Sequence, residues 1–453
     1  MENNMTKGKP LAVVLRFALP MVVGGIIQQL YSMLDMLVVG NIEGSRQLAA
    51  IGAADAPNFF ARAVIIGICT GFSAVAAKHF GANNLPMLKK VAASSLYISL
   101  AAAIILSLGG IFGAGPIMAL MNTPEDIIAE AVLYFQITIG AGIGMVFYNT
   151  ASALLRGVGD SKMPLIFLIA AFAMNIPLTL LLVAGLGMGV AGAGIATVVA
   201  QILSAAACFV FMFRKYEFFR LAVENVTPDL ESMWQILRIG LPVGMQTMMM
   251  AAGDMTIAGV VNGFGTDVVA AFATGNRIML NSMFLTMYVA MAHAVFAGQN
   301  LGAGKIGRIR QGFKETAVTV TVMSLIIAAV VFVFGDVLVR LFISDTDAYI
   351  ANIIPIAQLF LRIGTFFYIF LGLIWLYNYT LTGMGEVKVP FVSSLCELIA
   401  KVGGALLFSF MFGYVGIWFA APIGWVLGLI PSAVWYHTGR WEKKSPQSNV
   451  NLT

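Results

Sequence analysis

Long apolar stretches recur along the chain and are separated by short polar connectors. Each stretch reaches the roughly 20 apolar residues that an α-helix needs to cross a bilayer. The expected spans lie near residues 13–40, 51–77, 91–113, 128–153, 164–185, 190–213, 235–262, 268–298, 314–335, 353–380, 390–412 and 415–437. The pattern therefore predicts an all-α membrane protein with twelve transmembrane helices.

The apolar spans repeat in order. The first span reads LRFALPMVVGGIIQQLYSMLDMLVVGN from Leu15, and a second copy reads LRIGLPVGMQTMMMAAGDMTIAGVVNG from Leu237. Both copies hold a proline, a glutamine and an aspartate. Three later pairs match in the same order: AKHFGANN (77–84) with GQNLGAGK (298–305), RGVGDSKMP (156–164) with TGMGEVKVP (382–390), and GAGIA (192–196) with GIWFA (416–420). The chain is therefore predicted to be a duplication.

Six spans per copy is an even number, so both copies run the same way through the membrane. Transporters with such parallel repeats place their substrate near the midplane, where the two repeats meet. The expected division is an N-terminal six-helix lobe (1–213), a cytoplasmic linker (214–234) and a C-terminal six-helix lobe (235–453) with a short cytoplasmic tail.

Composition agrees with this class. The chain is 60% hydrophobic and only 10% charged, whereas soluble domains carry about 25% charged residues. Alternate connectors hold 20 lysines and arginines, and the opposite side holds two, Arg46 and Arg340. The positive-inside rule then places both termini in the cytoplasm of a multi-pass protein of the cell membrane. The net charge of +5 indicates topology and not nucleic-acid binding.

The energy source is expected to be an ion gradient or a partner, and not ATP. The extramembrane segments are too short for a nucleotide-binding domain. The nearest phosphate-loop sequence, GAGK at 302–305, lacks the first glycine and is followed by Ile306. No cofactor is expected, and a proton or sodium gradient would drive the protein.

Two acids stand inside the paired first spans, Asp35 and Asp254. An aspartate within a membrane helix costs about 2.5–3.5 kcal/mol on insertion scales, and such residues usually face a cavity and act there. For Asp35 the alternative is a hydrogen-bonded packing role. For Asp254 it is a fixed pair with Arg277 or Arg362. Glu397 and Lys401, four residues apart, are expected to neutralise each other, with the lysine stem reaching towards water.

The paired Leu-Pro spans with their aspartates, the Gly/Ala-rich loops after spans 2 and 8, the RGVGDSKMP loop and the Asn175–Leu178 stretch resemble the multidrug and toxic compound extrusion (MATE) transporters. The resemblance runs from about Leu11 to His437. It implies two six-helix bundles around a central cavity, and export of amphipathic organic cations in exchange for protons or sodium ions.

The resemblance also implies an ion-coupling site. Its residues here are Asp35, Asn175, Thr179, Ala193 and Thr197, with Asp254 as the acid of the second lobe. Many relatives carry an aspartate where this chain has Thr179, so this site would keep one carboxylate. Asn175 and Thr179 share a helix face, as do Ala193 and Thr197. Their oxygens suit a sodium ion at Asp35 or, equally, a protonated Asp35. Simple helix packing remains an alternative for Asn175 and Thr197.

The expected substrate cavity is lined by unbranched and polar side chains: Gln28, Gln246, Met279, Met283, Met287 and Tyr377. The methionines recur every four residues on one span, and flexible thioethers suit a promiscuous surface. The alternative is that these methionines belong to the bundle core or face lipid.

Two other functions remain open. The first is a flippase or a metabolite exporter, for example of flavins, in the same superfamily. A pyrophosphate-binding cavity should be strongly cationic, and the in-span cations nearly balance the acids, so drug export is favoured. The second is a membrane enzyme, which would need clustered polar residues. The three histidines stand apart at 79, 293 and 437, so a non-enzymatic protein is expected.

Overall fold

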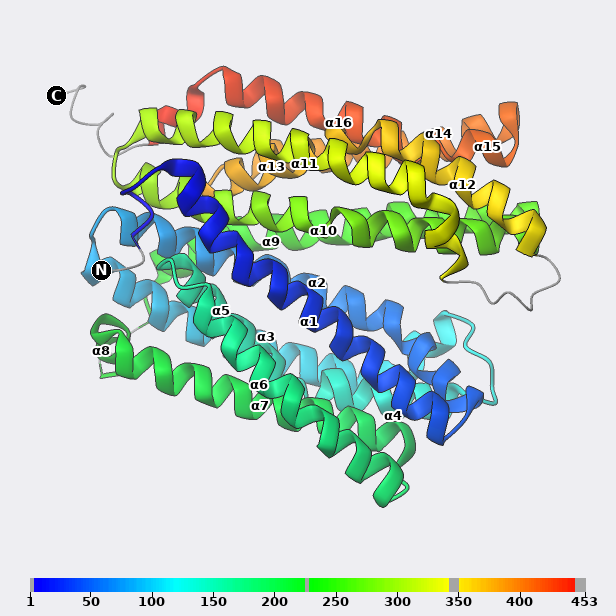
Figure 1. Cartoon of the computed structure of the whole chain (residues 1–453). Helices are drawn as coiled ribbons and strands as arrows, with labels where there is room; N and C mark the ends of the chain where they lie inside the picture. Colours follow the sequence, from blue (N-terminus) through cyan, green and yellow to red (C-terminus); the bar gives the residue numbers. More distant parts are fainter. Residues whose placement is uncertain (1–3, 225–227, 342–349, 445–453) are drawn as a thin grey trace. The chain divides into compact units, whose positions relative to one another are not determined.

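The computed structural model describes residues 4–224, 228–341 and 350–444, and every regular element in these ranges is a helix (Figure 1). The first helices are α1 (Pro10–Ile42), α2 (Ser45–Gly81), α3 (Leu85–Leu120), α4 (Ile128–Phe135), α5 (Ile143–Gly157), α6 (Lys162–Leu180), α7 (Gly189–Lys215) and α8 (Glu217–Glu224). They are followed by α9 (Leu230–Val261), α10 (Thr266–Gly302), α11 (Ile306–Arg340), α12 (Ile350–Phe366), α13 (Tyr368–Gly383), α14 (Lys388–Phe412), α15 (Tyr414–Ile417) and α16 (Ala420–His437). Two π-helical turns, η1 (Gln136–Gly140) and η2 (Leu181–Gly185), and two 3₁₀ turns, η3 (Asn262–Phe264) and η4 (Arg440–Lys444), complete the described chain.

The described helices account for the predicted spans in order. Nine are long and apolar enough to cross a membrane, and two further spans are bent helix pairs. The pair Ile128–Gly140 with Ile143–Gly157 is bent by 41°, and the pair Asn352–Phe366 with Tyr368–Gly383 by 52°. The remaining predicted span, 235–262, falls on the 32-residue α9, which is not among these apolar helices. The sequence predicted both bent spans as continuous; the first breaks at Gly140 and Gly142, residues of low helix propensity.

The contacts divide the chain into two compact units. Unit 1 holds Leu19–Gly244, and unit 2 holds Met5–Ala18 and Met245–Thr453. The first part of α1 therefore belongs to unit 2, and the first part of α9 belongs to unit 1. These units are groups of contacts, and the lobe boundaries expected from the sequence stay a prediction.

The internal duplication is visible in the backbone of two equivalent turns. Gly159 after α5 has φ 88°, and Gly385 after α13 has φ 76°, values that favour glycine because it has no Cβ. The amide of Gly159 donates to the Arg156 carbonyl at 2.9 Å, and the amide of Gly385 donates to Thr382 at the same distance. Each unit therefore uses the same turn to enter its next helix.

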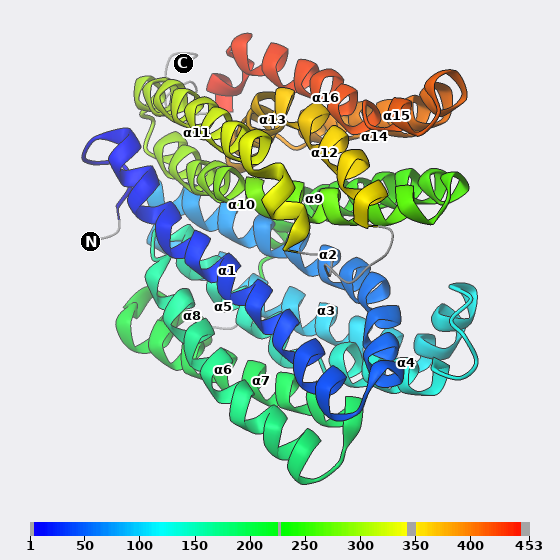
Figure 2. The same ribbon diagram turned by 45° about the vertical axis from the view of Figure 1, so that its right-hand side comes forward.

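Unit 1 is held together by closely packed helices. The helices α6 and α7 run side by side in both ribbon views (Figures 1 and 2). Gly67 and Gly71 of α2 face the first part of α9: a Cβ on Gly71 would meet the Ile236 carbonyl oxygen at 2.5 Å. The absence of side chains at these glycines lets the two backbones approach, as in other membrane bundles.

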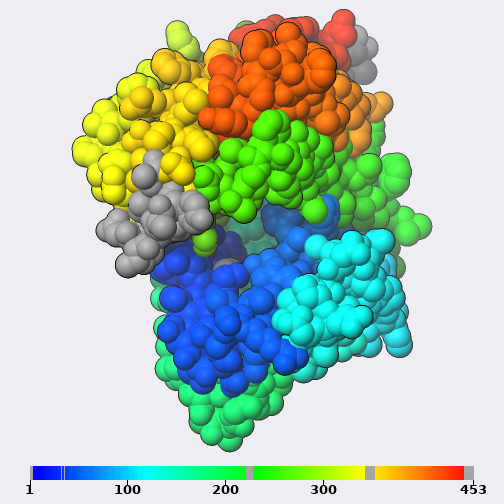
Figure 3. Space-filling view, turned by 90° about the vertical axis from the view of Figure 1, so that its right-hand side faces the viewer, coloured from blue at the N-terminus to red at the C-terminus, as the bar shows by residue number. Residues whose placement is uncertain are grey.

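Unit 2 has an aromatic and aliphatic core. Trp418 is 1% exposed, and its ring stacks on Phe272 of α10 with centroids 5.7 Å apart. Phe360 of α12 meets the same indole edge-on at 5.0 Å. The space-filling view shows the segment around α15 against the ends of α9 and α10 (Figure 3). Met279 and Met283 of α10 belong to this core.

Candidate functional site

The polar residues of the expected ion site lie on α6 and α7 of unit 1. Asn175, Thr179 and Ala193 are each 0% exposed, and Thr197 is 7% exposed. The amide nitrogen of Asn175 donates to the Thr197 hydroxyl at 3.4 Å, a long hydrogen bond between the two helices. The structure therefore brings together the amide and one hydroxyl that the sequence placed on separate spans.

Two buried oxygens of this site have no hydrogen-bond partner within the described residues: the Asn175 carbonyl Oδ1 and the Thr179 hydroxyl. Leaving a buried polar atom unpaired costs about 1–3 kcal/mol. Because residues four apart on a helix are neighbours, the two oxygens stand one turn from each other. They form an acceptor pair suited to a bound cation or to a group that carries a proton.

The backbone of α6 is irregular at the same place. Pro177 lies between Asn175 and Thr179 and removes one helix hydrogen bond, since proline has no N–H. The π-helical turn η2 begins two residues after Thr179. Single π turns within helices occur frequently at functional sites.

Tyr31 of α1 completes the described part of the site and was missed from the sequence. Its hydroxyl donates to the Thr197 carbonyl at 3.5 Å, and its ring lies 5.8 Å from that of Phe172 on α6. Tyr31 therefore brings α1 into contact with α6 and α7. Asp35 stands four residues later on α1, but its side chain lies outside the described residues. Its coupling role stays a prediction.

Asp254 of α9 is bound to Lys401 of α14. The Lys401 ammonium lies 3.3 Å from Asp254 Oδ1 and 2.9 Å from Glu397 Oε1. The side chains of Lys401 and Glu397 are 5% and 7% exposed, and that of Asp254 is 41% exposed. The predicted Glu397–Lys401 pair is confirmed. The expectation that the lysine reaches water is wrong, because glycines on α9 and α16 leave room for its stem inside the unit. The sequence had offered an arginine as a fixed partner of Asp254, and the cation found there is Lys401. Arg362, one of the two arginines considered, lies over the Phe332 ring.

The expected cavity residues occupy different environments. Met283 is 0% exposed and Met279 5% exposed, both in the core of unit 2, which favours the core alternative for these two. Met287 is partly exposed and Gln28 is exposed. Gln246 is 9% exposed, and its Nε2 has no hydrogen-bond partner within the described residues. Their place in a substrate cavity stays a prediction.

Tyr377 belongs to an aromatic cluster near the end of α16. Its hydroxyl lies 2.9 Å from His437 Nε2, and its ring contacts Phe313 at 4.7 Å and Tyr436 at 5.6 Å between centroids. Trp441 stacks on Tyr436 from the other side. Tyr377 is half-buried in this cluster, and the substrate role expected for it stays a prediction.

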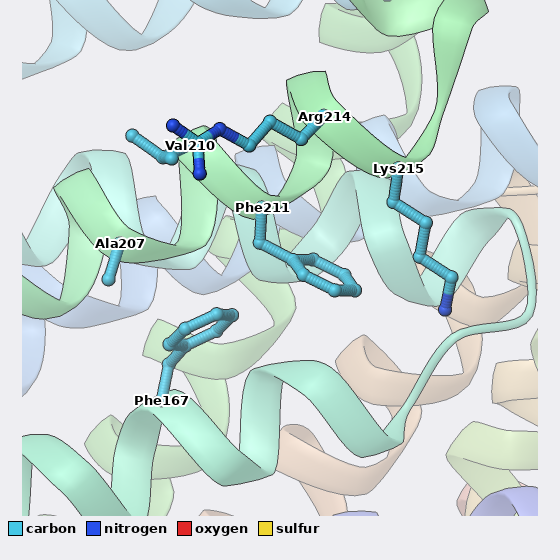
Figure 4. Close-up of a pocket in the computed structure, with 6 residues that line it drawn as sticks. All are labelled: Phe167, Ala207, Val210, Phe211, Arg214 and Lys215. Atoms are coloured by element: carbon cyan, nitrogen blue, oxygen red, sulfur yellow. The ribbon is translucent and has the colours of Figure 1, made fainter.

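A separate groove lies on unit 1 between α6 and α7 (Figure 4). Its volume is about 450 Å³, and its lining is Phe167, Ala207, Val210, Phe211, Arg214 and Lys215. The rings of Phe167 and Phe211 meet edge to face at 5.8 Å. The groove thus combines an apolar surface with two cations at the end of α7.

The MatE family model matches the chain twice, over residues 20–181 and 242–407. The chain belongs to the MatE family of transporters. The two matched segments fall on the two copies of the predicted duplication, and the predicted family is confirmed. The all-helical, twelve-span fold class predicted from the sequence is confirmed as well.

Similar proteins extend over the full length of this MatE transporter. The "Probable multidrug resistance protein YpnP" of Bacillus subtilis is 28% identical over 445 residues, which cover 97% of each chain. A solved multidrug resistance MATE family transporter of the MOP superfamily, in an outward-facing conformation, has a TM-score of 0.89 at 22% identity and covers 98% of this chain and 99% of its own. A Pyrococcus furiosus transporter of that superfamily, described as having a binding pocket of reverse polarity that suggests a different function, has the same TM-score and identity, with 97% and 98% covered.

Proposed function

We propose that this MATE protein exports amphipathic organic cations by alternating access, in exchange for protons or sodium ions. The observation that carries the proposal is the buried polar site of α6 and α7, next to the Tyr31 contact of α1. There the Asn175 and Thr179 side-chain oxygens have no hydrogen-bond partner among the described residues. The name of the Bacillus relative, a probable multidrug resistance protein, supports the substrate class.

In this proposal Asp35 is the coupling carboxylate. A sodium ion prefers oxygen ligands, and the Asn175 carbonyl with the Thr179 and Thr197 hydroxyls offers three. A protonated Asp35 could instead donate to one of the unpartnered oxygens. In either case the bound ion neutralises Asp35. Release of the ion restores a carboxylate that favours binding of an organic cation, so the two events compete.

Asp254 is proposed as a second acid, in unit 2, that receives the organic cation. Its side chain is 41% exposed, more open than its partners Glu397 and Lys401.

The remaining cavity residues proposed are Gln28, Gln246, Met287 and Tyr377. Both termini are proposed to lie in the cytoplasm. The bilayer is the environment, and neither ATP, nucleic acid nor a bound cofactor has a part in the proposed cycle.

The test is ethidium efflux from drug-sensitive cells that express wild type or Asp35→Asn at matched levels. Efflux should fall at least about tenfold in the variant, which corresponds to about 1.4 kcal/mol or more of lost coupling. The matched control is Asp336→Asn, which removes an exposed acid that pairs with Arg340 at the end of α11. If Asp35→Asn exported ethidium at the wild-type rate, Asp35 would be a packing residue and not the coupling carboxylate. No efflux by correctly inserted wild type would favour the flippase or metabolite exporter.

A further inference from the structure

We propose that Lys401 is a tethered cation that competes with the transported organic cation for Asp254. This inference rests on the proposed export of organic cations. It concerns three charged groups on two helices of unit 2: Asp254 on α9, and Glu397 and Lys401 on α14. Two carboxylates share one ammonium here, so the cluster as a whole retains one negative charge.

The internal repeat places Lys401 at the counterpart of an ion-site residue. Asn175 stands eleven residues after Pro164 on α6, and Lys401 stands eleven residues after Pro390 on α14. The two prolines occupy matching places in the repeated turn sequences. The position that holds a neutral amide in unit 1 therefore holds a covalently attached cation in unit 2. Unit 2 therefore has the Lys401 ammonium at the position where, among the described residues of unit 1, Asn175 has an oxygen without a partner.

The fold is shaped around the Lys401 side chain. A Cβ on Gly424 of α16 would lie 2.8 Å from Lys401 Cγ, and one on Gly253 of α9 would lie 3.4 Å from Lys401 Cδ. A Cβ on Gly428 would lie 3.0 Å from Glu397 Cβ. Glycines on both sides thus leave the space in which the lysine stem runs from α14 to Asp254. A buried ammonium requires such partners, because an unpaired charge inside a protein is strongly unfavourable.

The Lys401 ammonium lies at unequal distances from the two carboxylates, and this difference indicates which of the two an organic cation can take over. The ammonium lies 2.9 Å from the buried Glu397 and 3.3 Å from the half-exposed Asp254. An organic cation that reaches Asp254 can displace Lys401 from that carboxylate while the lysine keeps its closer partner. Lys401 therefore lowers the affinity of Asp254 for cations, and it neutralises Asp254 again when the cation leaves. In this way the lysine favours release of the substrate.

The test measures binding of tetraphenylphosphonium to the purified full-length protein by equilibrium dialysis. Lys401→Met alone would leave Glu397 buried without its partner, so the decisive variant is Lys401→Met/Glu397→Gln. We expect this variant to bind about tenfold more tightly than wild type, a gain of about 1.4 kcal/mol. Adding Asp254→Asn should remove the gain. If Lys401 only stabilised the fold, its loss would weaken tetraphenylphosphonium binding. Tighter binding therefore shows that Lys401 competes with the organic cation for Asp254.

The control is Arg340→Gln/Asp336→Asn, which removes another cation–acid pair, 3.2 Å apart, on the exposed end of α11. Its affinity should equal that of wild type. Unchanged or weaker binding by the folded Lys401→Met/Glu397→Gln variant, with normal binding by wild type, overturns the role of Lys401 and leaves the proposed export intact. Absence of binding by every protein, together with absence of efflux, overturns both.

A second inference concerns the groove between α6 and α7. We infer that it binds one anionic phospholipid, with an acyl chain against Phe167 and Phe211 and the headgroup phosphate at Arg214 (Figure 4). The lining residues Ala207 and Val210 are exposed, so the groove is open along its length. Basic sites at the ends of membrane helices favour anionic headgroups.

The two cations of the groove differ in their partners. Lys215 already pairs with the buried Asp160 at 3.1 Å and lies over the Phe211 ring at 5.1 Å. For Arg214 no hydrogen bond or ion pair is found within the described chain, and its side chain is exposed. Among the described residues Arg214 is therefore the groove cation without a charged partner, and a phosphate would supply one.

Native mass spectrometry of the protein with palmitoyl-oleoyl phosphatidylglycerol or phosphatidylcholine tests this site. Arg214→Gln should reduce phosphatidylglycerol binding by about tenfold and phosphatidylcholine binding by less, because choline already neutralises the charge of the phosphate in phosphatidylcholine. Arg362→Gln removes an exposed cation of unit 2 and serves as the control. An Arg214→Gln protein that keeps the wild-type preference for phosphatidylglycerol would refute the site.

Discussion

The side-chain amide of Asn175 on α6 lies 3.4 Å from the hydroxyl of Thr197 on α7, while its carbonyl oxygen has no partner within the described chain. A residue that served only to join two helices would be expected to use its acceptor as well as its donor. This carbonyl oxygen and the Thr179 hydroxyl, which likewise has no partner among the described residues, indicate a place for an incoming group.

Replacing Asn175 by leucine should abolish export without unfolding the protein. The change removes an amide that is only half satisfied, so the free energy of unfolding should fall by no more than about 1 kcal/mol. Efflux of ethidium should drop about tenfold or more. Ser204→Ala is the control, because Ser204 donates to the Phe167 carbonyl on the same helix pair. Full efflux by Asn175→Leu would assign Asn175 to packing.

The glycines of α2 should tolerate no side chain where they face α9. A Cβ on Gly71 would meet the Ile236 carbonyl oxygen at 2.5 Å, whereas a Cβ on Gly52 would meet nothing within 4 Å. Gly71→Ala should therefore destabilise the protein by about 1–3 kcal/mol through overpacking. Gly52→Ala should be neutral or slightly stabilising. Thermal unfolding in detergent compares the two, and equal melting temperatures would contradict the close approach of α2 and α9.

The segment before α1 should depend on Arg308 of α11. The guanidinium donates to the carbonyls of Gly8 at 2.6 Å, Lys7 at 2.8 Å and Met5 at 3.2 Å. Arg308→Gln should expose the bond after Lys7 to trypsin, since a protease needs a locally opened backbone. Arg310→Gln, which removes the pair with Glu442, should leave that bond protected. Equal cleavage in both variants would show that Arg308 does not hold the segment.

The start of α9 should lose stability in acid. Asp229 accepts hydrogen bonds from the Ser232 amide at 2.9 Å and hydroxyl at 2.6 Å, and it pairs with Lys90 at 3.1 Å. The Ser232 hydrogen bonds, with a smaller contribution from Lys90, lower the pKa of Asp229 in the folded protein. The stabilisation is therefore complete above the unfolded pKa of about 3.9 and is lost as the pH falls through the lower folded pKa.

Asp229→Ala measures this contribution directly. Its melting temperature should lie below that of wild type by a constant amount between pH 7 and pH 5, because the carboxylate stays ionised in both states there. Below about pH 4 the gap should narrow as wild type loses its cap. A gap that stays constant or widens down to pH 3 would contradict the role of the ionised carboxylate.

The sequence predicts features that depend on residues close together in the chain or on segments that repeat along it. The twelve spans, the duplication and the Glu397–Lys401 pair follow from apolar length, matching turns and a spacing of four. The link between Lys401 and Asp254 joins residues 147 apart, and no local pattern contains it. Likewise, the four-residue spacing of Met279 and Met283 indicates one helix face, but it cannot tell whether that face meets a cavity or the core. Tyr31 stands one helical turn before Asp35, and this position could have indicated it as a site residue. Its contact with Thr197 depends on helix packing and cannot be predicted from the sequence.

In the proposed cycle, binding of an ion that neutralises Asp35 drives the export of an organic cation. The most direct measurement uses purified protein in liposomes, with tetraphenylphosphonium movement recorded under an imposed proton gradient and then an imposed sodium gradient. Wild type should move tetraphenylphosphonium against the tetraphenylphosphonium concentration gradient when either the proton gradient or the sodium gradient is imposed in the opposite direction. Asp35→Asn should not. Transport by Asp35→Asn at the wild-type rate, or wild-type transport that ignores both gradients, would contradict the account.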